Sequence, residues 1–146
     1  MRFGRKLKGK GCECLKCLEL GVPKVNKMDN KEFSRLLELR TRKFAISILK
    51  LSASLPNTSE CKVIKYQVSK SGTSIGANYR EANRSRSKAD FANKIKICES
   101  EASETVYWLE LISELEKIEA DKMQLMINEA NEILALFTSI GKKLKL

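Results

Sequence analysis

The amino-acid sequence predicts an all-α protein, and specifically an antiparallel up-down four-helix bundle. After residue 28, apolar residues recur in alternating steps of three and four, which is the spacing of one face of a helix. The 146 residues include only two prolines and nine aromatic residues (five Phe, three Tyr and one Trp), whereas Leu, Ile, Lys and Glu are abundant. This composition favours helix over sheet, and the length suits a single domain with its own core.

The N-terminal residues 1–28 are predicted to be a disordered basic tail outside the bundle, which then spans residues 29–146. They mix Gly, Lys and Cys, show no sustained period and end in the turn-like Gly21-Val22-Pro23. We expect Met28 to be the natural start of translation, and the intact mass of protein made from its own gene tests this expectation.

The tail also lacks the features of a targeting segment. No apolar stretch follows its basic residues as in a signal peptide, and no run in the chain approaches the roughly 20 apolar residues that span a bilayer. The five cysteines are an odd number, which favours free thiols over a disulfide framework. We therefore expect a cytoplasmic protein with no membrane partner.

The first two helices are predicted from inward-facing residues that keep the three-and-four spacing. The first helix ends at Pro56, and its inward residues are Phe33, Leu37, Arg40, Phe44, Ile48, Leu51 and Leu55. Arg40 is the only polar residue among them. The second helix has smaller and more polar inward residues, namely Ile64, Val68, Ser71, Ile75, Asn78 and Ala82. Its small residues predict close packing against a neighbouring helix.

A break at residues 83–86 separates the second helix from the third. Ser87, with Asp90 three residues later, resembles a capping box and predicts a helix of about 28 residues, or roughly 40 Å, from this point. Its inward residues are Phe91, Ile95, Cys98, Ala102, Thr105, Leu109 and Ile112. The fourth helix begins near Asp121 and turns Met123, Ile127, Ala130, Leu134, Phe137 and Leu144 inward. Short connections between four such helices favour an antiparallel bundle.

The charge is large and unevenly distributed. The net charge of +10 favours a polyanionic partner, RNA or DNA, over other ligands. Residues 62–96 hold nine basic and two acidic side chains, a local charge of +7. Residues 99–132 hold ten acidic and two basic side chains, a local charge of −8. Such a dipolar surface suits either polyanion binding by one face or association between copies of the chain.

The candidate nucleic-acid-binding residues surround the predicted break between the second and third helices. They are Arg80, Arg84, Arg86, Lys88 and Lys94. No aromatic stacking platform interleaves these charges, so we expect contact with the phosphate backbone and a strong dependence on salt. The alternative is that these charges form a solvated face or weak ion pairs with neighbouring carboxylates.

We predict no catalytic residue, no metal site and no cofactor. The chain has no histidine, which removes the commonest general base and the Glu-x-x-His pairs of dimetal bundles, so the acidic run at residues 99–104 lacks partners for a metal. Cys12, Cys14 and Cys17 lack a fourth ligand at the spacing that a tetrahedral site requires. We therefore predict that the protein is not an enzyme.

Four further residues are predicted to act in helix packing or self-association. Gly72 and Gly76 lie four residues apart and allow another backbone to approach closely, within the bundle or between subunits. Asn78 is interpreted as a hydrogen-bonded residue that sets helix register. Trp108 lies beside the inward face of the third helix, as part of the core or as a contact between subunits.

The sequence resembles the bacterial four-helix bundle family known as 23S rRNA intervening-sequence proteins or S23 ribosomal proteins. The resemblance covers residues 32–143. It is carried by Leu39-Arg40 with Phe44-Ala45, by the motif SGTSIGANYREA at residues 71–82, by SKADF at residues 87–91 and by ETVYWL at residues 104–109.

The resemblance implies a four-helix bundle that assembles as a ring-like homopentamer. In some bacteria this family is encoded within the gene for large-subunit rRNA. A related branch is the accessory protein of diversity-generating retroelements, which acts with a reverse transcriptase and nucleic acid. The resemblance therefore implies self-association, RNA or DNA, and a reverse transcriptase as partners, and it brings no catalytic residues. Two functions follow as hypotheses: backbone binding of nucleic acid by a homo-oligomer, or a structural adaptor that docks a protein partner.

Overall fold

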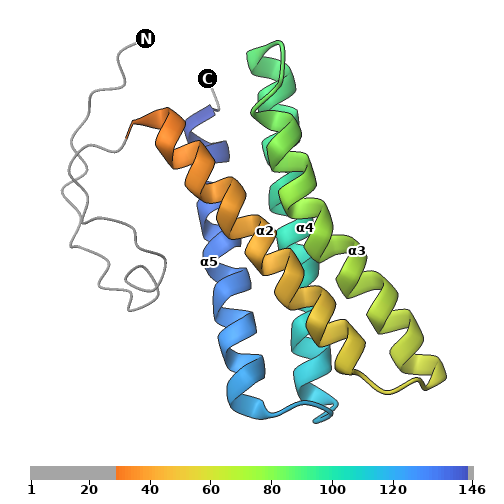
Figure 1. Ribbon diagram of the computed structural model, residues 1–146. Coiled ribbons are helices and arrows are strands. Elements are labelled where there is room, and N and C mark those ends of the chain that lie inside the picture. The colour runs from red at the N-terminus through yellow and green to blue at the C-terminus, as the bar shows by residue number, and fades with distance from the viewer. Residues whose placement is uncertain (1–28, 145–146) are drawn as a thin grey trace.

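Four helices, and no strands, make up residues 29–144, the part of the chain that the computed structural model describes. They are α2 (Asn30–Ser54), α3 (Ser59–Ala82), α4 (Lys88–Glu114) and α5 (Ala120–Leu144). The chain runs alternately up and down through them, and consecutive helices pack side by side (Figure 1). The predicted all-α four-helix bundle is confirmed. The predicted tail, residues 1–28, lies outside the described residues.

Three helices begin at side chains that cap them. Asp29, Thr58 and Ser87 each accept a hydrogen bond from the backbone N–H three residues later, at 2.7, 3.3 and 3.1 Å. These bonds satisfy N–H groups that have no partner within the helix. The start of the third helix at Ser87 is therefore as predicted. Within residues 29–144, no helix combines the length and hydropathy that crossing a membrane requires.

The core lies along the shared axis of the four helices, and α4 matches its sequence prediction best. Six of the seven residues predicted to face inward on this helix are buried, namely Ile95, Cys98, Ala102, Thr105, Leu109 and Ile112. Phe91 is only half-buried and packs at the edge of the core.

Three predicted core positions are wrong by one residue. The fully buried residue is Thr41 rather than Arg40 in α2, Tyr79 rather than Asn78 in α3, and Ile133 rather than Leu134 in α5. The predicted residues that lie seven apart around each error are buried, as Leu37 and Phe44 are around Arg40. At 3.6 residues per turn, the third and the fourth residue of such an interval lie on either side of the line that joins its ends, so either can face inward. Contact with the neighbouring helix decides between them.

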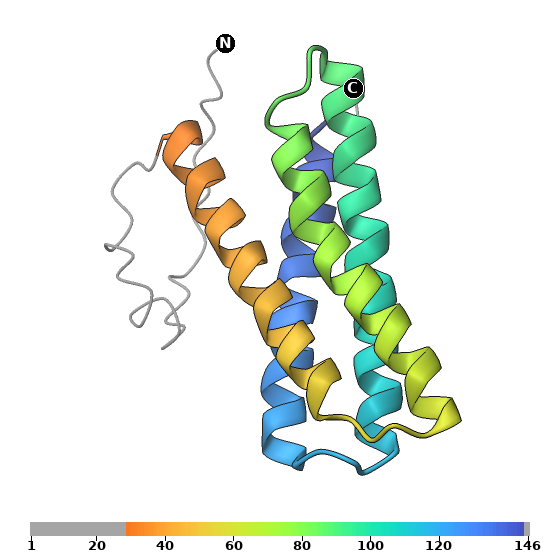
Figure 2. The ribbon, with the colours of Figure 1, turned by 45° about the vertical axis from the view of Figure 1, so that its right-hand side comes forward.

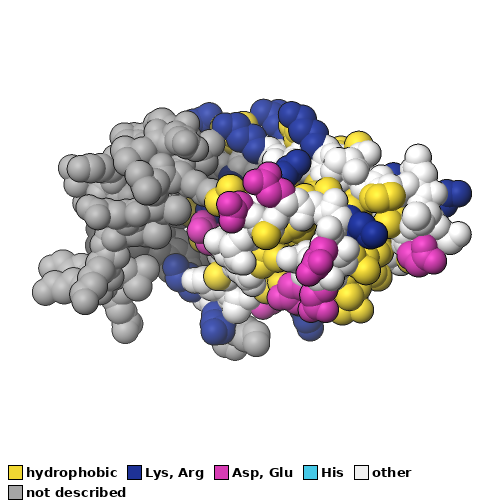
Figure 3. Space-filling model, turned by 90° about the horizontal axis from the view of Figure 1, so that it is seen from below, with side chains coloured by type: hydrophobic (Ala, Val, Ile, Leu, Met, Phe, Trp, Pro, Cys, Tyr) yellow, Lys and Arg dark blue, Asp and Glu magenta, His cyan; other side chains and the backbone are white. Residues whose placement is uncertain are grey.

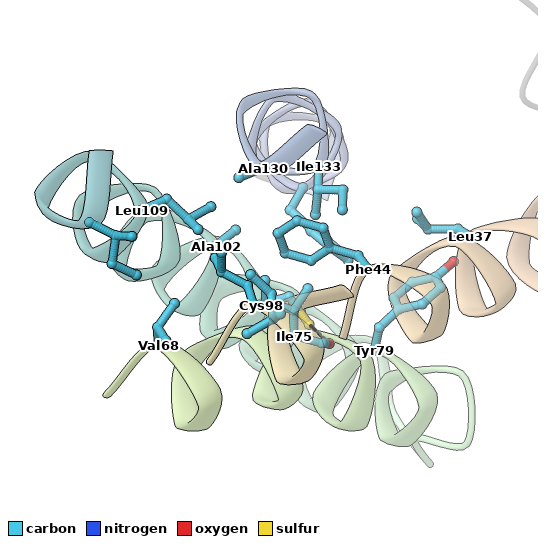
Figure 4. Packing of buried hydrophobic residues seen from close by; sticks show 14 of the residues in the cluster. Leu37, Phe44, Val68, Ile75, Tyr79, Cys98, Ala102, Leu109, Ala130 and Ile133 are labelled. Atoms are coloured by element: carbon cyan, nitrogen blue, oxygen red, sulfur yellow. Dashed lines mark hydrogen bonds between the residues drawn. The ribbon is translucent and has the colours of Figure 1, made fainter. Parts of the chain in front are cut away.

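An aromatic pair crosses the bundle from α3 to α5. The rings of Tyr79 and Phe137 meet edge to face, with centroids 5.4 Å apart and planes at 67°. Figure 4 shows Tyr79 beside Leu37, with its hydroxyl directed toward α2. Burial raises the pKa of this hydroxyl above its ordinary value. Both rings are almost fully buried, so this contact fixes how α3 and α5 pack across the core.

The two glycines of α3 lie against α2. A Cβ atom on Gly72 would lie 2.9 Å from two side-chain carbons of Ile48, and one on Gly76 would lie 3.2 Å from the hydroxyl oxygen of Thr41. A side chain at either position would push against α2, and real Cβ atoms do not approach to 2.9 Å. The glycines thus permit the short separation between α2 and α3 inside one chain.

Cys98 is a fully buried thiol of α4 that donates to the carbonyl oxygen of Ile75, with 3.5 Å between sulfur and oxygen. Burial raises the pKa of this thiol from 9.0 to about 12. We expect Cys98 to resist iodoacetamide at pH 8 in the folded protein and to react in urea, because only the exposed thiolate is reactive. Mass spectrometry of the digested protein checks this, and equal labelling in both states would contradict it.

The same shift predicts a dependence of stability on pH. The folded thiol stays neutral while the unfolded thiol ionises, so its contribution is complete below pH 9 and is lost as pH rises from about 9 to 12. The free energy of unfolding should fall in this window by at most about 1.4 kcal/mol per pH unit more than in a Cys98→Ala variant. Equal slopes for the two proteins would show that the shift is absent.

Candidate nucleic-acid interface

The connection between α3 and α4 forms one extremity of the molecule. In Figures 1 and 2 this turn extends beyond the first turn of α2 and the last turn of α5. Its backbone is well defined, because the N–H groups of Asn83, Arg84 and Ser85 donate to carbonyl oxygens at the end of α3 at 3.1, 3.0 and 2.9 Å. Ala82, the last residue of α3, is buried in the core directly before the turn. The side chains of the turn are therefore presented on a fixed backbone.

Three arginines project from this turn, and we call Arg80, Arg84 and Arg86 the basic tip. All three are exposed, and none forms an ion pair with another residue of the described part of the chain. Guanidinium groups present a planar set of donors that matches a phosphate. An exposed, unpaired cluster of this kind is suited to a polyanion.

Two of the carboxylates near the basic tip have other partners. Glu38 of α2 accepts from the side-chain amide of Asn83 at 2.8 Å, and Glu81 pairs with Lys94. Asp90 lies in the first turn of α4, where its negative charge interacts favourably with the positive end of the helix dipole. Glu38 and Glu81 therefore contact groups other than the three arginines, which favours the polyanion interpretation over the predicted alternative of local ion pairs.

The two predicted lysines differ from the arginines. The ammonium group of Lys94 lies 2.5 Å from a carboxylate oxygen of Glu81, and this hydrogen bond raises the pKa of Lys94. Lys94 therefore ties α4 to α3 and its charge is already matched. Lys88 is the first residue of α4 and is exposed, but it too takes part in an interaction. The structure brings all five predicted residues to the same end of the bundle.

Two basic residues at this end were missed by sequence reasoning. Lys142 and Lys143 are exposed in the last turn of α5. Because the helices alternate in direction, the end of α5 lies at the same end of the bundle as the α3–α4 turn (Figure 1). The up-down topology was the signal that could have placed them there.

The other predicted packing residues have partners within their own helices. Asn78 is half-buried and donates to the carbonyl oxygen of Ser74, one turn earlier in α3, at 2.9 Å. Trp108 is half-buried and donates to a carboxylate oxygen of Glu104 at 3.1 Å. Its ring meets that of exposed Tyr107 edge to face, with centroids 5.0 Å apart. Trp108 thus lies at the border between core and surface.

A protein-family model matches the sequence of most of the described residues. The model described as 23S rRNA-intervening sequence protein matches residues 37–139, which include most of the four helices and the entire basic tip. The chain belongs to the 23S rRNA-intervening sequence protein family. No curated protein matches it significantly.

A solved structure supports membership of the 23S rRNA-intervening sequence family. The chain is similar to a protein of unknown function from the S23 ribosomal protein family of Bacteroides thetaiotaomicron VPI-5482. The two sequences are 42% identical over 73% of this chain and 98% of that one, and the structures superpose with a TM-score of 0.68. Within residues 29–144, no group of acidic or cysteine side chains is arranged to hold a metal ion. Cys12, Cys14 and Cys17, which were predicted not to form a metal site, lie outside the described residues.

Proposed function

We propose that this protein is a non-enzymatic, homo-oligomeric member of its family that binds the phosphate backbone of nucleic acid through the basic tip. The observation that carries the proposal is the set of three exposed arginines without an ion pair among the described residues, on a fixed turn, two of whose neighbouring carboxylates have other partners. Backbone contacts of this kind position a protein on nucleic acid without reading its sequence.

The test compares charge reversals at opposite ends of the bundle. We expect Arg84→Glu with Arg86→Glu to weaken binding to structured RNA and duplex DNA, and to reduce the slope of log affinity against log salt by about 2. Adding Arg80→Glu should lower the slope again. Fluorescence anisotropy across a salt series measures both quantities.

The matched control is Lys117→Glu with Lys122→Glu. It changes the net charge by the same amount, but Lys117 lies in the α4–α5 connection and Lys122 in the first turn of α5, at the other end of the bundle, and both are exposed. The control should retain binding. If both double variants lose affinity equally, net charge alone drives binding and the basic tip is not the site.

A second candidate function is a structural adaptor that self-assembles and docks a protein such as a reverse transcriptase. It is favoured by the outer face of α4, where Ile97 is 40% and Tyr107 54% exposed beside half-buried Trp108. Exposed aromatic and aliphatic groups on a helix often anchor protein interfaces. Under this function Trp108→Ala should dissociate the oligomer, and nucleic-acid affinity should be negligible at physiological salt.

A further inference from the structure

The outer surface between α2 and α3 contains a shallow groove that none of the predicted site residues line. Its lining residues are Leu49, Lys62, Lys65, Tyr66, Ser69, Lys70 and Thr73. We call it the α2–α3 groove. Three of its side chains are cationic and none is acidic. Lys65 is held by Asn57, with 2.7 Å between its ammonium nitrogen and the amide oxygen.

Tyr66 is the most exposed large hydrophobic side chain in the described part of the chain, with 65% of its surface accessible. Lys62 and Lys70 lie four residues before and after it, so each lies one helical turn away on the same face of α3. An aromatic ring between two cations can stack on a nucleobase while the cations contact the flanking phosphates. In the end-on view of Figure 3, Lys and Arg side chains line the upper edge and hydrophobic side chains remain visible among the charged ones.

The groove is connected to the basic tip along one face of α3. Residues at steps of four and three from Tyr66 are Lys70, Thr73, Ala77 and Arg80, and all but half-buried Thr73 are exposed. None is acidic. The rise from Tyr66 to Arg80 is about 21 Å over 14 residues at 1.5 Å each. A flexible strand of nucleic acid could follow this face from the groove to the tip.

We infer that the α2–α3 groove binds single-stranded nucleic acid, with one base stacked on Tyr66 and its phosphates near Lys62 and Lys70. This inference rests on the proposed function in that both require a nucleic-acid ligand. Single strands are favoured because a duplex stacks its bases inside the helix and offers no free face to an exposed ring. An acidic protein would also match the charge of the lysines, but its binding would not depend on an aromatic ring at position 66.

The test measures affinity for an oligothymidylate and for a duplex of the same length. We expect Tyr66→Ala to weaken single-strand binding about 5- to 150-fold and to leave duplex binding nearly unchanged. Tyr66→Trp should retain single-strand binding, and its added fluorescence should be quenched by the oligonucleotide. The wild-type protein, whose one tryptophan is Trp108 on α4, supplies the baseline.

The matched control is Tyr107→Ala. Tyr107 is comparably exposed, at 54%, but it lines a groove between α4 and α5 that contains Glu99 and Glu104. This variant should bind the oligonucleotide as the wild type does. The inference is overturned if Tyr66→Ala leaves single-strand affinity unchanged, or weakens single-strand and duplex binding equally. A change in native mass without loss of affinity also overturns it and identifies the groove as a protein interface.

The same measurements separate the two proposals. If the arginine variants bind normally while Tyr66→Ala loses single-strand affinity, the basic tip fails as a site and the groove stands. If the arginine variants lose affinity and Tyr66→Ala does not, only the groove fails. Absence of all binding at low salt rejects both.

Discussion

Replacing Gly72 with leucine is expected to lower the free energy of unfolding by about 3 kcal/mol, the upper end of the usual cost of overpacking a core. Gly72 is buried, and even a single Cβ atom there would lie 2.9 Å from two carbons of Ile48. Leucine adds three further carbon atoms in the same direction. The α2 and α3 helices must then separate, and urea denaturation followed by circular dichroism measures the loss.

Two further variants test whether contact with Ile48 causes the loss of stability. Gly141 also lies in a helix, but a Cβ atom there would meet nothing closer than 3.8 Å, so Gly141→Ala should stabilise the protein by up to about 1 kcal/mol. Ile48→Ala removes the clashing carbons, so the destabilisation caused by Gly72→Ala should be smaller in an Ile48→Ala background. Strictly additive effects would show that the Ile48 contact is not responsible.

The second large effect is expected at Arg40, which joins α2 to α5. Its guanidinium group pairs with Glu129 of α5 through two hydrogen bonds of 2.7 and 2.9 Å and with Glu132 at 2.5 Å. The bond to Glu129 raises the pKa of Arg40 above its ordinary value. The side chains of Arg40 and Glu129 are only 24% and 20% exposed. Arg40→Ala should therefore cost about 2 kcal/mol, since it leaves two neighbouring carboxylates without a partner.

The control for Arg40 is the ion pair of Arg35 with Glu32. That pair lies on the surface of α2, with side chains 63% and 45% exposed, so Arg35→Ala should change stability little. Arg40→Lys should recover only part of the loss, because an ammonium group cannot form the paired contact with Glu129. Equal effects of Arg35→Ala and Arg40→Ala in thermal denaturation would show that burial adds nothing to the Arg40 interaction.

The fold could be predicted from local signals because the helices obey local rules. Pro56 and the capping groups Ser87 and Asp90 mark boundaries within single stretches of chain, and the structure places the boundaries there. The inward face of α4 was predicted almost completely. The errors at Arg40, Asn78 and Leu134 arose where two adjacent residues compete for one inward position, and only contact with the neighbouring helix decides between them.

Some features of the candidate site could likewise be predicted from the sequence, and others depend on the tertiary structure. The arginines of the basic tip are close in sequence, so their clustering needed no tertiary information. The pairing of Lys94 with Glu81, the arrival of Lys142 at the same end, and the groove around Tyr66 depend on segments that the bundle brings together. The spacing of Lys62, Tyr66 and Lys70 was present in the sequence, but the exposure of Tyr66 and its position beside Leu49 follow from how α3 packs on α2.

The sequence by itself determined the four helices of residues 29–144, their limits and the charge of the turn between α3 and α4. These properties depend on residue spacing, on capping and on proline, all of which act within a few residues. Only the tertiary structure decided which cations remain unpaired and which polar residue links distant helices. Arg40 shows why. The spacing of apolar residues in α2 predicted a core position for it. Its contacts with Glu129 and Glu132, which lie 89 and 92 positions later in the chain, exist only because α2 and α5 pack antiparallel.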